Sequence, residues 1–549
     1  MEDRRVRGPE SERPAATPWH RDPIDWMRWA NHHGATESLG TKTMRKLMPS
    51  LALAAVPLLA CERAGTAPLP SFEALFPSVE GDLMTTSSPG LADLTGDGVP
   101  DIVFGNGVDR VQPADGGYVF AQEPDPPGEV IAVSGATNEV LWAVPHPGDA
   151  FTTPRFTDLN GDSVPDVVMG GREGAFSALS GASGEVLWRL SPTEVAGTPV
   201  PYNFFTPAPI ADANGDGVAE LLVVYGGDAT KQPGEPRAPG YLVVVSGADG
   251  TPIAVHETPD GGESYASTVV YERPDGSEWV VFGTGGEADG GTAYRAPVAS
   301  LVDGSFAQRA EQLVDPGTKG VIAPATMVEL TGDEELDVVL STFDGRLIAV
   351  DGSTREVLWE QNAEGEETYH PAAVLRIQRD GRLGLLVSRG VGVFPRYAGT
   401  VHRLYDAASG RILYEHRDAN HPAGAPLGVD LDGDGIDEPF FFSMRYPTTQ
   451  GARIHILHAP SRSLITHDLP ANFATTPLIA DPRGTGTLEL IGLSWRIAST
   501  DAAPDWRTLT WQLLRLALDA RTPAFSSWAA YMGTASDGHY AAPAAANRQ

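Results

Sequence analysis

A nine-residue acidic loop that recurs along the chain constrains the fold more than any other feature of the sequence. Its first copy, residues 93–101, places side-chain oxygens at positions one, three, five and nine and a glycine at position six. Calcium takes roughly six to eight oxygen ligands, so this spacing favours calcium over zinc or copper. The β-rich run Ile102–Phe104 follows where an EF-hand would continue as a helix, which excludes an EF-hand.

Five copies of the loop keep most of the acidic positions, and position seven is expected to contribute its backbone carbonyl. The predicted ligands are Asp93, Thr95, Asp97, Val99 and Asp101; Asp158, Asn160, Asp162, Val164 and Asp166; Asp212, Asn214, Asp216, Val218 and Glu220; Glu329, Thr331, Asp333, Glu335 and Asp337; and Asp430, Asp432, Asp434, Ile436 and Glu438. Glycine is absent at position six in two copies, which carry Ser163 and Glu334 there. The alternative is that each loop is an Asx-rich turn without a metal.

Three further copies of the loop have lost most of the acidic positions, and we call them worn: residues 271–279, 376–384 and 481–489. In the last of these Arg483 stands between the end acids Asp481 and Glu489, where a guanidinium group would replace the metal. With the five intact copies they give eight units of about 58 residues each, a period typical of repeat architectures.

Each unit carries four short stretches of strand-forming sequence. Proline-led strands precede most of the loops, a β-branched run follows each loop, and the fourth strand repeats Glu-Val-Leu-Trp at residues 139–142, 185–188 and 356–359. Four antiparallel strands per unit predict an all-β fold, a β-propeller of eight four-stranded blades, with seven blades as the alternative. We expect the recurring tryptophans to pack between blades, although a carbohydrate platform is the other interpretation.

The loops and their proline-led strands resemble FG-GAP and VCBS repeats of the integrin-alpha type. The third and fourth strands resemble the PQQ-like repeats of bacterial quinoprotein propellers, and the ending Trp528–Tyr540 resembles the tail that closes such propellers. The resemblance covers nearly the whole mature chain and implies the fold and calcium binding. It implies little about activity, because this architecture hosts adhesins, lyases, dehydrogenases and scaffolds.

The N-terminal region resembles a bacterial lipoprotein signal. Basic residues, an apolar run and a small residue precede Cys61, the single cysteine, which implies cleavage before Cys61 and lipid on its sulfur. We therefore expect a leader or upstream mis-start at 1–43, a signal peptide at 44–60, a tether at 61–86, the propeller at 87–540 and a tail at 541–549. Glu62 favours the bacterial outer membrane or cell surface. The alternative for this stretch is a buried thiol or a short membrane helix.

The formal net charge of −33 argues against a nucleic-acid partner, because such binders need clustered Lys and Arg. The sequence lacks His-Glu-x-x-His, Gly-x-Ser-x-Gly and a phosphate-binding Gly-rich loop. We expect a monomeric, calcium-binding module for a protein or glycan ligand. The alternative is an enzyme, either a polysaccharide lyase or a quinone-dependent dehydrogenase.

Residues just before the first strand of each unit are expected to approach the central channel. They are Thr152, Asn203, Tyr265, His370, His421 and Asn472. A general base, if one exists, is expected at His370 or His421, and a lyase would add Arg389 or Arg396. The other interpretation is that all six are ordinary strand-start residues over a packed core.

Overall fold

The computed structural model describes most of the chain from residue 72 to residue 540. The described residues are 72–108, 111–114, 117–120, 127–174, 176–190, 195, 202–228, 231, 235–394, 396–445, 451–458, 461–469, 472–473, 475–496, 509–521 and 527–540. The predicted leader, signal peptide, lipidation site Cys61 and tail 541–549 lie outside them. No helix in the described part is long and apolar enough to cross a membrane.

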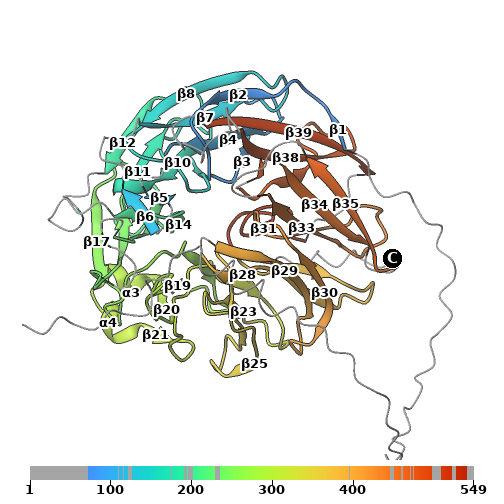
Figure 1. Ribbon diagram of the computed structural model, residues 1–549. Helices are drawn as coiled ribbons and strands as arrows, with labels where there is room; N and C mark the ends of the chain where they lie inside the picture. The colour runs from blue at the N-terminus through green and yellow to red at the C-terminus, as the bar shows by residue number, and fades with distance from the viewer. Residues whose placement is uncertain are drawn as a thin grey trace, which may run out of the picture. The chain divides into compact units, whose positions relative to one another are not determined.

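Eight antiparallel sheets stand around a common axis as the blades of a β-propeller, which confirms the predicted fold and blade number (Figure 1). From the inner to the outer strand, blades 1 to 4 are β3 (Gly90–Ala92), β4 (Asp101–Asn106), β7 (Gly128–Val133) and β8 (Val140–His146); β9 (Arg155–Thr157), β10 (Asp166–Gly170), β11 (Phe176–Leu179) and β12 (Val186–Leu190); β14 (Ala208–Ile210), β15 (Glu220–Gly226), β16 (Tyr241–Val245) and β17 (Pro252–Glu257); and β18 (Val269–Glu272), β19 (Glu278–Gly283), β20 (Ala293–Pro297) and β21 (Glu311–Gln312).

Blades 5 to 8 repeat this arrangement. They are β22 (Thr326–Val328), β23 (Asp337–Ser341), β24 (Arg346–Val350) and β25 (Val357–Asn362); β27 (Ala373–Arg376), β28 (Leu383–Val393), β29 (Arg396–Asp406) and β30 (Ile412–Asp418); β32 (Leu427–Val429), β33 (Glu438–Met444), β34 (Ala452–His458) and β35 (Ser463–Leu469); and β37 (Leu478–Ala480), β38 (Thr487–Arg496) and β39 (Thr510–Arg521), completed by β1 (Phe72–Ala74) and β2 (Val79–Asp82).

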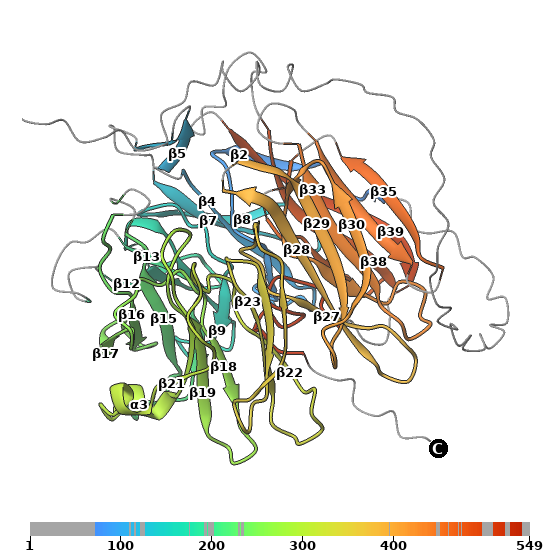
Figure 2. The same ribbon diagram turned by 60° about the horizontal axis from the view of Figure 1, so that its bottom comes forward.

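Shorter strands and helices lie in the connections between these strands. β13 (Asn203–Phe204), β26 (Glu366–Glu367), β31 (His421–Pro422) and β36 (Asn472–Phe473) each pair with the second strand of the blade that follows them. β5 (Val111–Ala114) and β6 (Gly117–Phe120) form a hairpin between β4 and β7, and η1 (Arg172–Gly174), α3 (Val298–Val302) and α4 (Phe306–Arg309) fill other turns. Figure 2 shows α3 at the outer edge of blade 4.

The ring closes between the two ends of the described chain. β1 and β2 both pair antiparallel with β39, with Phe72 opposite Leu518 and Val79 opposite Leu513. Both strands fall in the stretch predicted as a tether, so the structure differs from the prediction there. Blade 8 thus combines N-terminal and C-terminal strands, which ties the first blade to the last.

Burial along the strands follows from their position in the blade. Every residue of the second strands β10, β15 and β23 is buried, because a neighbouring blade covers each face. The outer strands β8 and β25 instead alternate between exposed and partly buried residues, since they have a neighbour on one side only.

The repeated tryptophans lie between blades, as predicted. The indole N–H groups of Trp142, Trp188 and Trp359 donate to the carbonyls of Gly181, Gly247 and Ala407 in the next blade, at 2.9, 2.8 and 2.9 Å. In two further blades an arginine of the third strand makes the corresponding bond: Arg295 donates to Gly352 at 2.5 Å and Arg515 to Gly135 at 2.7 Å. A donor from one blade to a turn carbonyl of the next is therefore a recurring contact of the ring.

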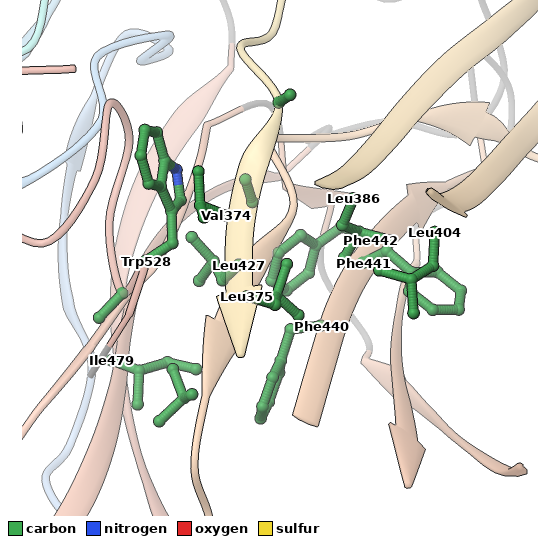
Figure 3. Packing of buried hydrophobic residues seen from close by; sticks show 14 of the residues in the cluster. Val374, Leu375, Leu386, Leu404, Leu427, Phe440, Phe441, Phe442, Ile479 and Trp528 are labelled. Atoms are coloured by element: carbon green, nitrogen blue, oxygen red, sulfur yellow. The ribbon is translucent and has the colours of Figure 1, made fainter. Parts of the chain in front are cut away.

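The C-terminal segment 527–540 crosses the channel along the inner strands. Its backbone pairs with Gly428 of β32 through Trp528, with Ile479 of β37 through Ala529, and with Met327 of β22 through its last residues. Figure 3 shows Trp528 beside Val374 and Leu427 in the apolar cluster that joins blades 5 to 8. Trp528 is fully buried, so this segment belongs to the core.

Candidate functional sites in the loops and at the channel

The nine-residue loops all connect the first strand of a blade to the second. In the first loop the Asp93 carboxylate accepts the backbone N–H groups of Gly96 and Gly98 at 2.8 and 2.9 Å, and Asp97 accepts that of Val99 at 2.8 Å. Asp158, Asp212 and Asp430 make the same two contacts in their own loops. The acids at positions one and five therefore curl each loop around its own backbone.

Position six needs the left-handed backbone conformation that glycine adopts without strain. Its φ is +82° at Gly98, +89° at Gly217 and +86° at Gly435. Ser163 and Glu334 occupy the same position with φ of +70° in both cases. Those two loops keep the turn geometry at the steric cost that a side chain brings to this region.

The acid at position nine is buried in each of the five intact loops. The Asp101 carboxylate is fully buried and accepts three backbone N–H groups, from Leu94 at 2.9 Å, Thr95 at 3.1 Å and Gly135 at 3.0 Å. Gly135 lies in the turn between the third and fourth strands, and its carbonyl accepts the bond from Arg515 of blade 8. Asp101 thus joins the loop, a second turn and the neighbouring blade.

This contact at position nine recurs around the ring. Asp166, Glu220 and Asp337 likewise accept the N–H groups of Gly181, Gly247 and Gly352, at 3.2, 3.1 and 2.9 Å. A side chain cannot replace these glycines, because a Cβ on Gly181 or Gly247 would lie 2.0 Å from a backbone carbonyl oxygen. The ninth acids therefore organise the blade interfaces, and they do so through backbone amides.

The fifth intact loop, residues 430–438, brings several carboxylates close together. Carboxylate oxygens of Asp430, Asp432 and Asp434 lie within 4.8 Å of one another, and so do donor atoms of Asp432, Glu438 and His458. Burial, together with the three neighbouring carboxylates, raises the pKa of Glu438 to about 8. Arg376 and Arg379 offset part of this charge, at 3.8 Å from Asp430 and 3.2 Å from Asp434. The close approach of the carboxylates makes the fifth loop the best candidate for a cation.

The remaining predicted ligands have the following places. The amide oxygens of Asn160 and Asn214 accept the N–H groups of Asp162 and Asp216, each at 2.8 Å. The Glu335 side chain pairs with Arg273 at 2.7 Å, in the worn loop of the preceding blade. Their role as calcium ligands stays a prediction.

In the worn loop 481–489 an ion pair lies where the sequence predicted that a guanidinium group would replace the metal. Arg483 Nε lies 2.6 Å from one oxygen of the buried Glu489, and Arg515 lies 2.8 Å from the other. The prediction that a guanidinium group occupies this position is confirmed, with a second arginine added from β39.

A second candidate site lies at the opposite end of the propeller. In an up-and-down blade the loops between strands two and three, and the connections between blades, meet at the end away from the nine-residue loops. Arg237, on the 2–3 connection of blade 3, lies 3.1 Å from Glu263 and 3.7 Å from Asp289, and it donates to the Tyr265 hydroxyl. Burial raises the pKa of Glu263 to about 7, although Arg237 opposes that shift.

The network continues across the channel to blade 6. The Tyr369 hydroxyl donates to Glu287 at 2.5 Å, which joins residues from blades 4 and 6. Glu367 pairs with Lys319 and accepts the Tyr397 hydroxyl at 2.9 Å. Burial raises the pKa of Glu287, whereas the bond from the Tyr369 hydroxyl and the positive charges of Arg237 and Arg172 oppose that shift.

Blades 1 to 3 complete this group. Arg172 lies 3.0 Å from Asp149 and stacks over the Phe151 ring at 4.6 Å, and Phe151 contacts Phe205 edge-on at 5.6 Å. We call these side chains the channel ring, and it consists of Asp149, Phe151, Arg172, Phe205, Arg237, Glu263, Tyr265, Glu287, Asp289, Lys319, Glu367, Tyr369, Phe394 and Tyr397. The ring alternates aromatic faces with charged groups, an arrangement that can hold a polar ligand.

Of the residues that the sequence placed at the channel, Tyr265 belongs to the channel ring. His370 follows Tyr369 directly, its Nδ1 is buried without a hydrogen-bond partner among the described residues, and burial lowers its pKa to about 4. His421 packs its ring 5.6 Å from Tyr397. Thr152, Asn203 and Asn472 are buried, and Thr152 donates to the Gly170 carbonyl at 3.1 Å, as a strand-start residue would.

Arg389, which the sequence offered as a cation for a lyase, is bound to backbone carbonyls of blade 5. This buried side chain donates to the carbonyls of Gly345 and Arg346 in blade 5, at 2.6 and 3.0 Å. Arg396 is exposed at the tip of the β28–β29 hairpin.

The sequence reasoning missed the charged members of the channel ring. Asp149, Glu263 and Glu367 lie two or three residues before expected channel residues, which is a weak signal. The other charged members, Arg172, Arg237, Glu287, Asp289 and Lys319, lie in connections that no motif marks.

Comparison with known proteins supports the fold. The profile described as FAM234A/B beta-propeller matches residues 91–300. Protein FAM234B of Mus musculus is 27% identical over 201 residues, 36% of this chain and 29% of that protein. Protein FAM234A of Mus musculus is 32% identical over 145 residues, 24% of this chain and 25% of that protein. The chain thus matches less than a third of the length of either relative.

Solved structures extend the likeness to the whole ring. A europium-containing methanol dehydrogenase superposes with a TM-score of 0.55 at 12% identity, covering 81% of this chain and 93% of its own. A quinohemoprotein alcohol dehydrogenase from Pseudomonas putida HK5 gives a TM-score of 0.50 at 12% identity, covering 82% and 77%. At this identity the likeness shows the fold alone. The FG-GAP and VCBS resemblance stays a prediction.

Proposed function

We propose that this chain is a calcium-stabilised, lipid-anchored propeller outside the cytoplasm, and that its channel ring binds a glycan. The observation that carries the proposal is the channel ring itself, where half-buried aromatic faces alternate with carboxylates and guanidinium groups. Sugars offer both apolar ring faces and hydroxyl groups, which such a surface can stack against and hydrogen-bond. A protein ligand is the other outcome of the test below.

The cross-blade bonds of the channel ring support a preformed binding surface. Tyr369 is held by Glu287 and Tyr397 by Glu367, so both aromatic side chains are oriented before a ligand arrives. Preorganised groups lose little conformational entropy on binding. The C-terminal segment along the inner strands favours binding from the end where the channel ring lies.

Calcium is proposed at the nine-residue loops, first of all at Asp430, Asp432 and Asp434. The mutual approach of their carboxylates to within 4.8 Å supports a hard dication there. Metal binding to a folded loop adds to the free energy of unfolding, since the unfolded loop holds no such site.

The anchor is proposed at Cys61, with placement at the bacterial outer membrane or cell surface. The basic residues, apolar run and small residue before Cys61 support it. Mass spectrometry of the mature N-terminus is expected to find a diacylated Cys61, and Cys61→Ser is expected to release the protein from membranes. A chain that keeps an intact Met1 in its native host would contradict this part.

Glycan binding is tested on an array of bacterial and plant polysaccharides, followed by titration of the best ligand. Glu287→Gln combined with Tyr369→Phe removes one charge and one hydroxyl from the channel ring, and we expect at least tenfold weaker binding. Glu257→Gln, exposed at the end of β17, is the matched control and should bind as the wild type does. Equal affinity of the wild type and the double variant would contradict the proposal, as would binding of proteins alone.

Calcium binding is tested by thermal melting. Chelation is expected to lower Tm, and calcium at about 100 times its Kd should restore about 2.7 kcal/mol per site. Asp430→Asn with Asp432→Asn should reduce the response, whereas Asp249→Asn, exposed in another turn, should leave it intact. An unchanged Tm on chelation would contradict calcium at the loops.

A further inference from the structure

Three histidines and an aspartate meet between blades 6 and 7, away from both sites described above. Nitrogen atoms of His416 and His455 and a carboxylate oxygen of Asp418 all lie within 4.8 Å of one another. The ring centres of His416 and His455 are 5.1 Å apart. His402 lies beside both, with its ring centre 6.1 Å from that of His416 and 6.0 Å from that of His455.

Strand register explains how the sequence assembles this group. His402 of β29 stands directly opposite His416 of β30, so the two imidazoles share one face of blade 6. Asp418 follows two residues after His416 and therefore returns to that face. His455 enters from β34 of blade 7 and reaches Asp418 at 3.1 Å between Nε2 and Oδ2.

The donor atoms are oriented by a surrounding layer of hydroxyl groups. His455 Nδ1 lies 3.0 Å from Thr466 Oγ1, and His402 Nδ1 lies 2.8 Å from Ser388 Oγ. Ser443 Oγ donates to Asp418 Oδ2 at 2.7 Å. A hydrogen bond at one imidazole nitrogen fixes the tautomer in which the other nitrogen carries the free lone pair, as in protein metal sites.

One nitrogen in the group has no partner. His402 is fully buried, and its Nε2 makes no hydrogen bond within the described part of the chain. An unsatisfied buried polar atom is costly, and a metal ligand is one role that accounts for it. Phe441 packs against His402 and His455 at ring-centre distances of 4.4 and 5.1 Å, which gives the site an apolar wall.

We propose that His416, Asp418 and His455 bind a divalent transition metal of the zinc class, with His402 beside them in the wall of the site. Two imidazoles and a carboxylate suit zinc, whereas calcium prefers oxygen ligands throughout. His455 is 2% exposed and the Asp418 side chain is 5% exposed, whereas His416 is only partly buried, so an ion can enter beside His416 on β30. The ion would join β30 of blade 6 to β34 of blade 7.

Arg453 and the backbone N–H of Asn420 already contact Asp418 and compete with an ion for its carboxylate. Arg453 Nη1 lies 3.7 Å from Asp418 Oδ1, and Arg453 also pairs with Asp468 at 2.9 Å. Asp418 Oδ1 accepts the Asn420 N–H at 3.0 Å. Asp418 Oδ2 faces His455, so the metal would bind on that side of the carboxylate and leave the Arg453 contact in place.

The test is a zinc titration of the full chain, freed of metal and then saturated with calcium so that the loops do not compete. The wild type is expected to bind one zinc ion more than the variant His416→Gln with His455→Gln, and cobalt should give a visible absorption band that the variant lacks. His467→Gln is the matched control, because His467 lies on β35 of the same blade and its ring contacts Phe72 at 4.6 Å. It should keep the zinc ion.

A subtler variant keeps the proposal testable if the double variant does not fold. Thr466→Val removes only the hydroxyl beside His455 Nδ1, and we expect zinc affinity to fall by about 10- to 100-fold. Zinc stoichiometry and affinity unchanged in Thr466→Val, or an identical cobalt spectrum in a folded double variant, would overturn the proposal.

Discussion

Replacing the buried carboxylate of Asp101 by an amide tests whether the ninth acid holds the blade interface. In Asp101→Asn the single remaining oxygen can accept the N–H groups of Leu94 and Thr95, or that of Gly135, but not all three. The amide NH₂ then faces a backbone N–H without an acceptor. Losing a bond to a charged acceptor and leaving that donor buried costs about 2–4 kcal/mol in the free energy of unfolding.

The assay combines urea unfolding with hydrogen exchange, both in the presence of a calcium chelator. Peptides that contain Leu94, Thr95 and Gly135 should exchange faster in Asp101→Asn, because their N–H groups lose an acceptor. The matched control is Asp97→Asn, since Asp97 is exposed and asparagine keeps an oxygen for the Val99 N–H. It should change the free energy of unfolding by less than about 0.5 kcal/mol. Equal cost and equal exchange in the two variants would refute the reasoning.

Three further predictions concern other parts of the ring. Trp188→Phe leaves the Gly247 carbonyl without its indole donor at 2.8 Å and should cost about 1–3 kcal/mol, measured by urea unfolding; no loss would contradict the proposed inter-blade bond. Burial raises the pKa of Glu263 from 4.5 to about 7, so its protonated form is favoured on folding, and the free energy of unfolding should fall as pH rises between those values; Glu263→Gln should remove that part of the slope, measured by unfolding at a series of pH values. Trp528→Ala should cost about 3–5 kcal/mol, because this fully buried side chain packs under blades 6 to 8, and a cost below about 1 kcal/mol would place the C-terminal segment outside the core.

Sequence reasoning predicted the parts of the structure that depend on contacts between residues close together in the sequence. The acidic loop fixes its own turn through contacts between residues a few positions apart, as Asp93 does with Gly96 and Gly98, so its recurrence could be read directly. The repeat length of about 58 residues and the four strand-forming stretches in each unit then predicted the propeller and its blades. The packing of Trp142 against the next blade was predictable because each blade must bury a flat side against a neighbour.

What sequence reasoning missed depends on contacts between distant residues. Nothing in Phe72–Ala74 distinguishes a tether from a strand until its partner Leu518 is known. The channel ring draws Arg237 and Glu287 from irregular connections that share no motif. The pairing of His416 with His455 requires the relative height of two blades, which no period specifies.

Closure of the ring through β1, β2 and β39 has a consequence for how the protein is made. β1 and β2 are synthesised before the other strands that the structure describes, and their partner β39 is synthesised after them. Contacts of such sequence separation form slowly, and every intermediate carries an open strand edge at both ends of the growing arc. An unpaired edge can be protected by chaperones until β39 is made. Without that protection, β1 and β2 of one chain can pair with β39 of another, which gives a strand-swapped dimer.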